Sequence, residues 1–210
     1  MQIDFIADVV CPWCYLGWRR LGKALALRPD VEATVTWRPY QLDPSLPDEG
    51  VDRRAYYAAR FPDPERRDAI GKVLNEAAAE DGVVWNLADI PVSPNTNAAH
   101  RLIRWAQGAG RQDAVLEAVL AAYFTELKDI GDPVVLADIG AACGMDRTLI
   151  LRLFSEEADK DTITREYILA ARAGVSGVPF MIFDGKVAVG GAETPEKIAQ
   201  AIDKALELAA

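Results

Sequence analysis

The chain has 210 residues and a net charge of −9, with half of its residues hydrophobic and about a quarter charged. This is the composition of a globular protein, long enough for one large domain or for one domain with a sizeable insertion. The acidity argues against nucleic acid and anionic membrane surfaces as partners, because both bind through basic patches. The N-terminus lacks the pattern of a signal peptide and no apolar run has the length of a membrane span, so we expect a cytoplasmic protein.

The chain opens with a predicted strand, helix and strand. Residues 2–8 (QIDFIAD) are mostly apolar, which predicts a buried strand. Helical spacing follows, in which Cys14 and Trp18 share the apolar face, and Pro29 ends the helix. The run 31–40 (VEATVTWRPY) alternates and is rich in β-branched residues, which predicts a second strand. These three elements predict a parallel βαβ unit.

The middle of the chain, from residue 51 to about residue 174, carries helical spacing and little strand signal. Asp63, Asp132 and Thr194 each precede a proline, which predicts an N-cap followed by the first helical residue. Strand signal returns near the C-terminus in VPFMIFDGKVAVGG, where Asp184–Gly185 predicts the turn of a hairpin. An amphipathic helix is predicted to close the chain.

The pair Cys11 and Cys14, in the motif CPWC, is the strongest chemical signal in the sequence. With Cys11 as N-cap and Pro12 in the first turn, unpaired N–H groups and the helix dipole stabilise a thiolate at Cys11. Cys14 lies on the inward-facing stripe of the helix. We therefore predict that Cys11 is exposed and attacks a disulfide, and that Cys14 is buried and resolves the mixed disulfide.

Two other interpretations of this pair are two buried structural thiols and half of a zinc site. The chain has one histidine, His100, and its third cysteine, Cys143, is distant and predicted to be a buried side chain at a helix end. No second cysteine pair and no neighbouring histidine complete a set of four zinc ligands, so we expect no metal.

Several segments together resemble one family: FIADVVCPWCYLG, WRPYQLDP, NTNAAHRL and AGVSGVPFMIFDGKVAVGGAETPE. They resemble the DsbA-like thioredoxin-fold oxidoreductases, in particular the FrnE-like branch, which is related to 2-hydroxychromene-2-carboxylate isomerases and kappa-class glutathione transferases. The resemblance implies an α/β fold, a thioredoxin fold with a large all-helical insertion. Residues 1–42 and 173–210 would form a discontinuous thioredoxin-like domain, and residues 43–172 the helical insertion.

The resemblance also implies roles for residues near the C-terminal strands. In the family a cis-proline faces the redox cysteines, and the matching residue here is Pro179, preceded by Val178, whose backbone would pair with substrate. The glutathione-dependent isomerases and transferases carry serine at the position that matches Cys11. The cysteine at this position favours dithiol–disulfide chemistry over glutathione activation.

Four further residues are candidates from their positions in the sequence. Asp8 either accepts a proton from Cys14 or caps N–H groups at the strand end. Trp13, expected to be exposed, either contacts substrate or only shields the disulfide from water. Asn95 and His100 line a substrate groove if the helical block overhangs the site, whereas the structural alternative for His100 is an interhelical hydrogen bond.

Three functions remain open at this point. The leading one is a thiol–disulfide oxidoreductase, an enzyme that acts on disulfide-containing proteins or small thiols. The alternatives are a glutathione-dependent isomerase or transferase acting on a small aromatic acid, and a non-enzymatic binding module. We expect no bound cofactor beyond the redox-active disulfide, with glutathione as a candidate co-substrate and glutathione or thioredoxin as candidate reductants. In a reducing cytosol the pair rests as a dithiol, which favours reduction or isomerisation over oxidation.

Overall fold

The computed structural model describes residues 1–209, which form two compact units. We call Met1–Tyr40, together with the chain from Arg165 onward, the sheet unit, and Gln41–Thr164 the helical unit. The division falls inside a helix, because α8 extends over Lys160–Arg172. The sequence-based boundaries at residues 42 and 173 stay a prediction.

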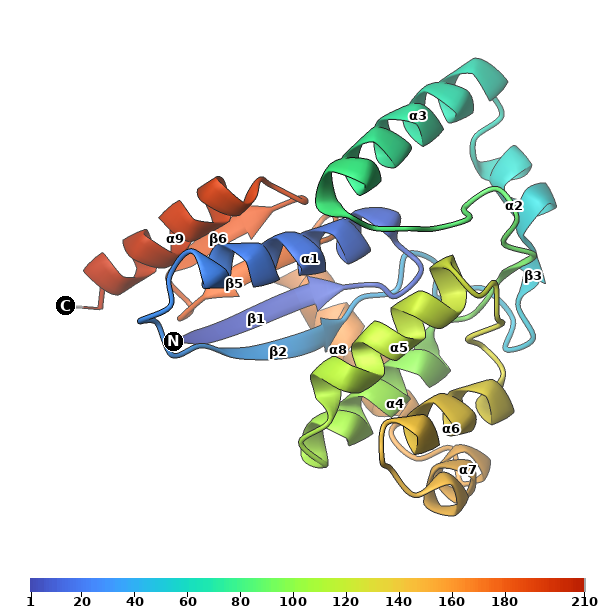
Figure 1. Cartoon of the computed structure of the whole chain (residues 1–210). Helices are drawn as coiled ribbons and strands as arrows, with labels where there is room; N and C mark the ends of the chain where they lie inside the picture. The colour runs from blue at the N-terminus through green and yellow to red at the C-terminus, as the bar shows by residue number, and fades with distance from the viewer. Residues whose placement is uncertain (210) are drawn as a thin grey trace. The chain divides into compact units, whose positions relative to one another are not determined.

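A four-stranded mixed sheet, in the order β2-β1-β5-β6, is the centre of the sheet unit (Figure 1). Strand β1 (Gln2–Ala7) pairs in parallel with β2 (Thr34–Pro39), and α1 (Pro12–Ala26) connects the two. On its other side β1 pairs antiparallel with β5 (Phe180–Phe183), which pairs antiparallel with β6 (Val187–Gly190). The predicted parallel βαβ unit is confirmed.

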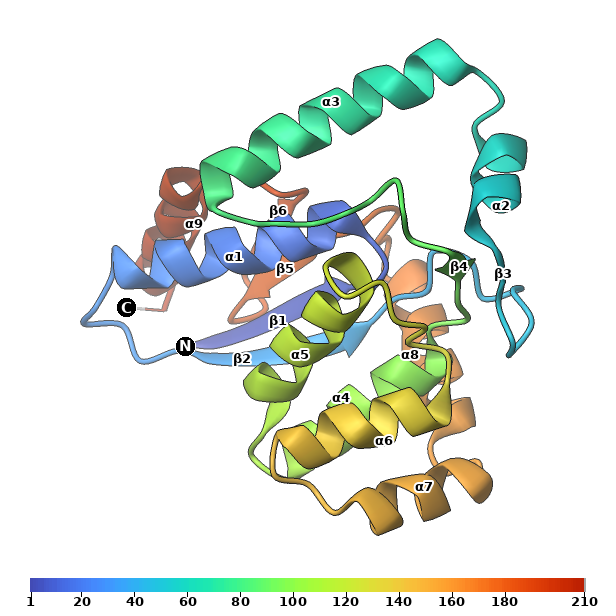
Figure 2. The same cartoon turned by 45° about the vertical axis from the view of Figure 1, so that its right-hand side comes forward.

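Helices α1 and α9 (Pro195–Glu207) pack against each other, and α9 also packs on β5 and β6. Figures 1 and 2 show both helices on the same face of the sheet. The apolar side chains between these layers form the core of the unit. Among them Phe5, fully buried on β1, stacks on Trp37 of β2 with ring centroids 5.5 Å apart and meets Trp18 of α1 edge-on at 5.6 Å. This aromatic cluster holds α1 against the parallel strands.

The hairpin between β5 and β6 turns at the predicted residues. Asp184 and Gly185 have φ angles of 48° and 67°, a backbone conformation that aspartate tolerates and glycine adopts freely. The Asp184 carboxylate also accepts a hydrogen bond of 2.6 Å from the Gln2 backbone N–H, and the Asp184 N–H donates to the Gln2 carbonyl at 2.8 Å. The turn is thereby tied to the start of β1.

The helical unit consists mainly of helices, as expected. Its helices are α2 (Arg53–Arg60), α3 (Pro64–Asp81), α4 (Asn97–Gly108), α5 (Gln112–Phe124), α6 (Pro133–Ala142), α7 (Arg147–Ser155) and the start of α8.

The predicted N-caps are confirmed. The Asp63 side chain accepts from the Arg66 N–H, and the Asp132 side chain accepts from the Val134 N–H. In the sheet unit, Thr194 caps α9 in the same way. Each side chain pairs a backbone donor that the first helical turn leaves free.

A short ladder departs from the expected all-helical insertion. Strand β3 (Val51–Asp52) pairs antiparallel with β4 (Val92–Ser93). A two-residue strand is too short to show the alternation of polar and apolar residues by which strands are recognised in a sequence. The predicted fold class is otherwise unchanged by it.

No helix among residues 1–209 combines the length and the apolar character that crossing a membrane requires.

An ion pair joins the C-terminal end of α1 to α9. The Arg28 guanidinium donates two hydrogen bonds to the Asp203 carboxylate, at 2.6 and 2.5 Å. The hydrogen bond and charge of Arg28 hold the pKa of Asp203 below its ordinary value. A carboxyl group with a depressed pKa in the folded state stabilises the fold above its unfolded pKa, and this contribution is lost as pH falls through the folded pKa.

We therefore expect Asp203→Asn to lower the melting temperature slightly at pH 7, because exposed pairs contribute little. The difference from wild type should begin to shrink as pH falls below the unfolded pKa of about 3.9 for aspartate, and it should vanish below the lower pKa of the folded state. Thermal melts of both proteins between pH 7 and pH 3 measure it. A difference that stayed constant over this range would contradict the assignment to this ion pair.

Candidate active site

The CPWC motif lies at the start of α1. Cys11 is the N-cap of this helix, with an extended backbone, and Pro12 is its first residue, as predicted. The Cys11 N–H donates to the Asp8 carbonyl at 3.2 Å, and the Cys11 carbonyl accepts from the Cys14 N–H at 3.0 Å. These bonds connect the end of β1 to the first helical turn without a long loop. Both cysteines are free thiols.

Cys14 is fully buried, as predicted. Burial raises the pKa of the Cys14 thiol well above its ordinary value, and the hydrogen bond and charge of Cys11 raise it further. The charge of the Asp8 carboxylate also raises the pKa of Cys14, whereas a hydrogen bond with the Asp8 backbone lowers this pKa. Cys14 is therefore a protonated thiol at neutral pH and becomes a nucleophile only when its proton is removed.

Cys11 is less accessible than the sequence predicted. Its exposed fraction is 5%, so the expectation of an exposed Cys11 is wrong. Within the sheet unit one reason is the segment before β5, since the Val178 carbonyl oxygen lies 4.0 Å from the Cys11 Sγ. The Sγ makes no capping hydrogen bond to the helix, and its partners include this carbonyl and the Cys14 thiol.

Pro179 is buried, and its peptide bond with Val178 is cis. Its ring lies against α1 at Gly17, where an added Cβ would stand 2.8 Å from the Pro179 Cγ and 3.5 Å from the Phe5 ring. Real Cβ atoms do not approach a ring carbon this closely, so Gly17 lets Pro179 reach the helix one turn after Cys14. Sequence reasoning missed Gly17, although it follows the CPWC motif by three residues.

Asp8 follows β1 directly and is 1% exposed. Its carboxylate raises the pKa of Cys14, as described above. The pKa of Tyr40 is raised by burial, by Tyr167 and by the charge of Asp8. Tyr40 follows β2, its N–H donates to the Ala7 carbonyl at 2.9 Å, and its ring meets Tyr167 edge-on at 5.2 Å. Sequence reasoning missed Tyr40. Its position directly after a parallel strand could have indicated a functional residue, because ligand-binding sites lie at the carboxyl ends of such strands.

The remaining predicted residues fall in both units. Trp13, between the cysteines, is half-buried where an exposed side chain was expected. In the helical unit, Asn95 is half-buried, donates to the Leu46 carbonyl at 2.6 Å and accepts from the Gln41 side chain at 3.2 Å. His100 is 1% exposed on α4. The substrate roles of Asn95 and His100 stay predictions.

Cys143 is the C-cap of α6 and is half-buried, where the sequence predicted a buried thiol at a helix end. Burial raises its pKa. Among residues 1–209, no group of three or more histidine, cysteine, aspartate or glutamate side chains is arranged to hold a metal ion.

A model of the DsbA-like thioredoxin domain matches residues 2–203. The chain belongs to the DsbA-like thioredoxin family. A probable DsbA oxidoreductase from Streptomyces coelicolor has a similar structure, with a TM-score of 0.90 and 27% identity over 99% of this chain and 90% of that one. This similarity supports an oxidoreductase at the level of the family.

Two other solved structures share the fold at lower identity. A 2-hydroxychromene-2-carboxylate isomerase has a TM-score of 0.70 and 20% identity, over 100% of this chain and 98% of that one. The cytosolic disulfide reductase DsbM from Pseudomonas aeruginosa, with GSH, has a TM-score of 0.65 and 16% identity over the same shares of the two chains. These similarities show that the fold is shared.

The different environments of the three thiols predict an order of alkylation. At pH 7, iodoacetamide should modify Cys11 first, because it lies at a helix N-terminus whereas burial raises the pKa of Cys14 and Cys143. At pH 9, the alkylation rate of Cys143 should approach that of Cys11, because Cys143 is only half-buried. Cys14 should still react slowly. Peptide mass spectrometry over a time course measures the order, and labelling of Cys143 first at pH 7 would refute it.

Gly17→Ala tests the contact between α1 and Pro179. The added methyl group has to displace the proline ring, which we expect to cost about 1–3 kcal/mol of stability and to lower thiol–disulfide turnover. Gly22→Ala, on the same helix with no atom within 4 Å of the added Cβ, is the matched control. It should stabilise the helix by about 0.5–1 kcal/mol. Urea unfolding and a turnover assay measure both variants, and equal behaviour of the two would contradict the contact.

Proposed function

We propose that this protein is a thiol–disulfide oxidoreductase in which Cys11 is the nucleophile and Cys14 the resolving thiol. The observation that carries this proposal is the contrast between two thiols on one helical turn. Cys11 is the N-cap of α1, at the positive end of the helix dipole, and Cys14 is a fully buried thiol with a raised pKa. Cys11 is thus placed to attack a substrate disulfide first, and Cys14 to react in the second step.

The proposed reaction has two exchange steps that conserve sulfur–sulfur bonds. The Cys11 thiolate attacks one sulfur of a substrate disulfide, forms a mixed disulfide, and releases the other substrate sulfur as a thiolate. The Cys14 thiol then loses its proton and attacks the Cys11 sulfur. The second substrate thiolate leaves, Cys11 and Cys14 form a disulfide, and two electrons have passed to the substrate.

The second step needs a proton acceptor, because burial keeps Cys14 protonated. We propose Asp8 for this role, since its carboxylate is buried and close enough to influence the Cys14 pKa. Tyr40 is affected by the same carboxylate.

Substrate would bind beside the Val178–Pro179 segment, because the Val178 carbonyl lies at the Cys11 sulfur. A substrate segment that pairs with the Val178 backbone as an added strand would bring its disulfide to Cys11. Trp13 would contact the same segment from the first turn of α1. Asn95 and His100 are proposed as further substrate contacts from the helical unit.

We propose reduction or isomerisation as the net direction, in a reducing compartment such as the cytoplasm. The disulfide formed at Cys11 and Cys14 would then be reduced again by a second thiol, which supplies the two electrons. Glutathione is the first candidate, which the structural similarity to DsbM with GSH supports, and a thioredoxin is the second.

A glutathione-dependent isomerase is the second candidate function. The structural similarity to a 2-hydroxychromene-2-carboxylate isomerase favours it. The presence of cysteine at position 11, with a second thiol one turn later, favours the first candidate.

Cys14→Ser separates the two functions. If Cys14 resolves the mixed disulfide, Cys14→Ser should accumulate a covalent adduct on Cys11 when mixed with oxidised glutathione or with insulin. Its turnover should fall to the uncatalysed rate, as should that of Cys11→Ser, which forms no adduct. Insulin reduction by turbidity and adduct mass by mass spectrometry measure this. An isomerase would retain most of its activity in Cys14→Ser, and absence of an adduct would contradict the proposed exchange.

A further inference from the structure

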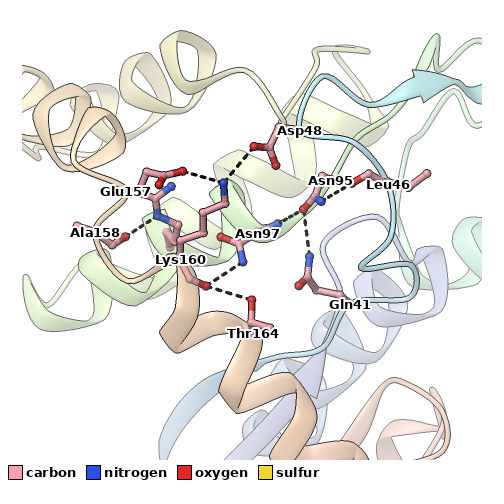
Figure 3. A network of polar contacts seen from close by, with 10 residues as sticks. Gln41, Leu46, Asp48, Asn95, Asn97, Glu157, Ala158, Lys160 and Thr164 are labelled. Atoms are coloured by element: carbon pink, nitrogen blue, oxygen red, sulfur yellow. Dashed lines mark hydrogen bonds and ion pairs between the residues drawn. The ribbon is translucent and has the colours of Figure 1, made fainter.

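The helical unit contains a cavity of about 170 Å³ that the redox chemistry does not use. It lies among the start of α4, the connection from α7 to α8, and the loop that precedes β3, and Figure 3 shows the polar side chains around it. The residues on which the argument rests are Asp48, Asn97, Arg101, Phe154, Glu157 and Lys160.

Asn97 lines this cavity and carries a buried acceptor without a partner. Its side-chain Nδ2 donates to the Lys160 carbonyl at 3.1 Å, and because a carbonyl only accepts, this bond defines which amide atom is nitrogen. The Asn97 Oδ1 is buried and has no hydrogen-bond partner, in a residue that is 8% exposed. Buried polar atoms without a partner are rare and destabilising, so this oxygen requires a donor.

Arg101 brings a buried positive charge to the same cavity. It is 5% exposed, and its Nε and Nη2 donate to the carbonyls of Ala158 and Leu153 at 2.6 and 2.9 Å. Its guanidinium also lies over the Phe154 ring, 5.0 Å from the centroid. Among residues 1–209 the guanidinium has no carboxylate within ion-pair distance. The charges of Glu157, Asp159 and Asp48 act on this guanidinium without forming an ion pair with it, which leaves room for an anionic partner in direct contact.

Three exposed or partly exposed charges lie beside these buried groups. The Lys160 ammonium pairs with the Asp48 carboxylate at 3.1 Å and with the Glu157 carboxylate at 2.8 Å. The side chains of Asp48 and Glu157 are 74% and 68% exposed, so the acidic groups lie on the solvent side. With Arg101, two cations and two carboxylates surround the cavity, and its walls carry no net charge.

We propose that this cavity binds a small α-amino acid as its zwitterion. The carboxylate would pair with Arg101, and the ammonium would donate to the Asn97 Oδ1 and be attracted by the two acidic residues. A simple anion would leave the Asn97 Oδ1 without a donor, and a simple cation would leave Arg101 without an anionic partner. Cavities of about 150 Å³ hold a molecule the size of benzene, which matches an amino acid with a short apolar side chain.

The same α-amino-acid group is present in free amino acids and in the γ-glutamyl end of glutathione. The shared chemistry is one carboxylate and one ammonium on the same carbon. The experiment therefore uses both sources as separate ligands. The proposal concerns the helical unit alone and is independent of the reaction at Cys11.

Calorimetric titration of the full chain tests the proposal with L-alanine, propionate, ethylamine and glutathione. L-alanine should bind about tenfold or more tightly than propionate or ethylamine, because each of these lacks one of the two charged groups. Binding of glutathione but not of alanine would also support the proposal, provided that the variants below weaken it, and would identify the γ-glutamyl source. Equal binding of propionate and alanine would overturn it in favour of an anion site.

Two variants tie binding to the cavity. Asn97→Ala removes the buried acceptor and should weaken binding about ten- to hundredfold, the usual effect of a hydrogen bond to a charged group. Glu157→Gln keeps the shape of an exposed side chain and should weaken binding of the zwitterion but not of propionate. Its matched control is Glu193→Gln, which breaks a similar exposed pair with Lys197 in the sheet unit and should leave binding unchanged.

Circular dichroism melts show whether each variant folds, and if Asn97→Ala does not, Glu157→Gln carries the test. Absence of binding of alanine and glutathione up to about 20 mM, where even a weak site would be partly filled, would overturn the proposal. Binding that every folded variant retains in full would overturn it as well.

Discussion

The short connection between β1 and α1 is the constraint on which the rest of the site depends. Residues 8–11 lead from the end of the strand to the helix, and the Asp8 carbonyl accepts from the Cys11 N–H within this turn. Because the turn is so tight, Cys11 has to be the N-cap, and Cys14 has to face the sheet one turn later. The aromatic cluster around Phe5 then holds this helix in place on the parallel strands.

The two thiols differ because the helix presents them to different surroundings. Cys11 lies where unpaired backbone N–H groups and the helix dipole favour negative charge. Cys14, on the same turn, is enclosed by the core, where any charge is costly, and burial therefore raises its pKa. The segment before β5 completes the site, since Val178 borders the Cys11 sulfur and Pro179 contacts the helix at Gly17.

In the helical unit, the C-terminal end of a helix, rather than the N-terminal end, lies beside a buried functional group. The buried Arg101 donates to the carbonyls of Leu153, near the end of α7, and of Ala158, just beyond it. The C-terminal end of a helix carries partial negative charge, which stabilises a cation beside it. A thiol at a helix N-terminus in one unit and a guanidinium at a helix C-terminus in the other thus both occupy buried positions.

Features that depend on residues close together in the chain could be predicted from the amino-acid sequence. The N-caps at Asp63, Asp132 and Thr194, the turn at Asp184–Gly185 and the place of CPWC at the start of a helix all follow from local backbone chemistry. Contacts between groups far apart in the chain became evident only from the fold. The limited exposure of Cys11, the contact of Gly17 with Pro179, the influence of Asp8 on Tyr40, and the unpaired oxygen of Asn97 near Arg101 each involve segments that approach through packing. Spacing along the chain carries the period of a helix or a strand, but it does not carry the distance between two elements, which is determined by how their side chains fill the core.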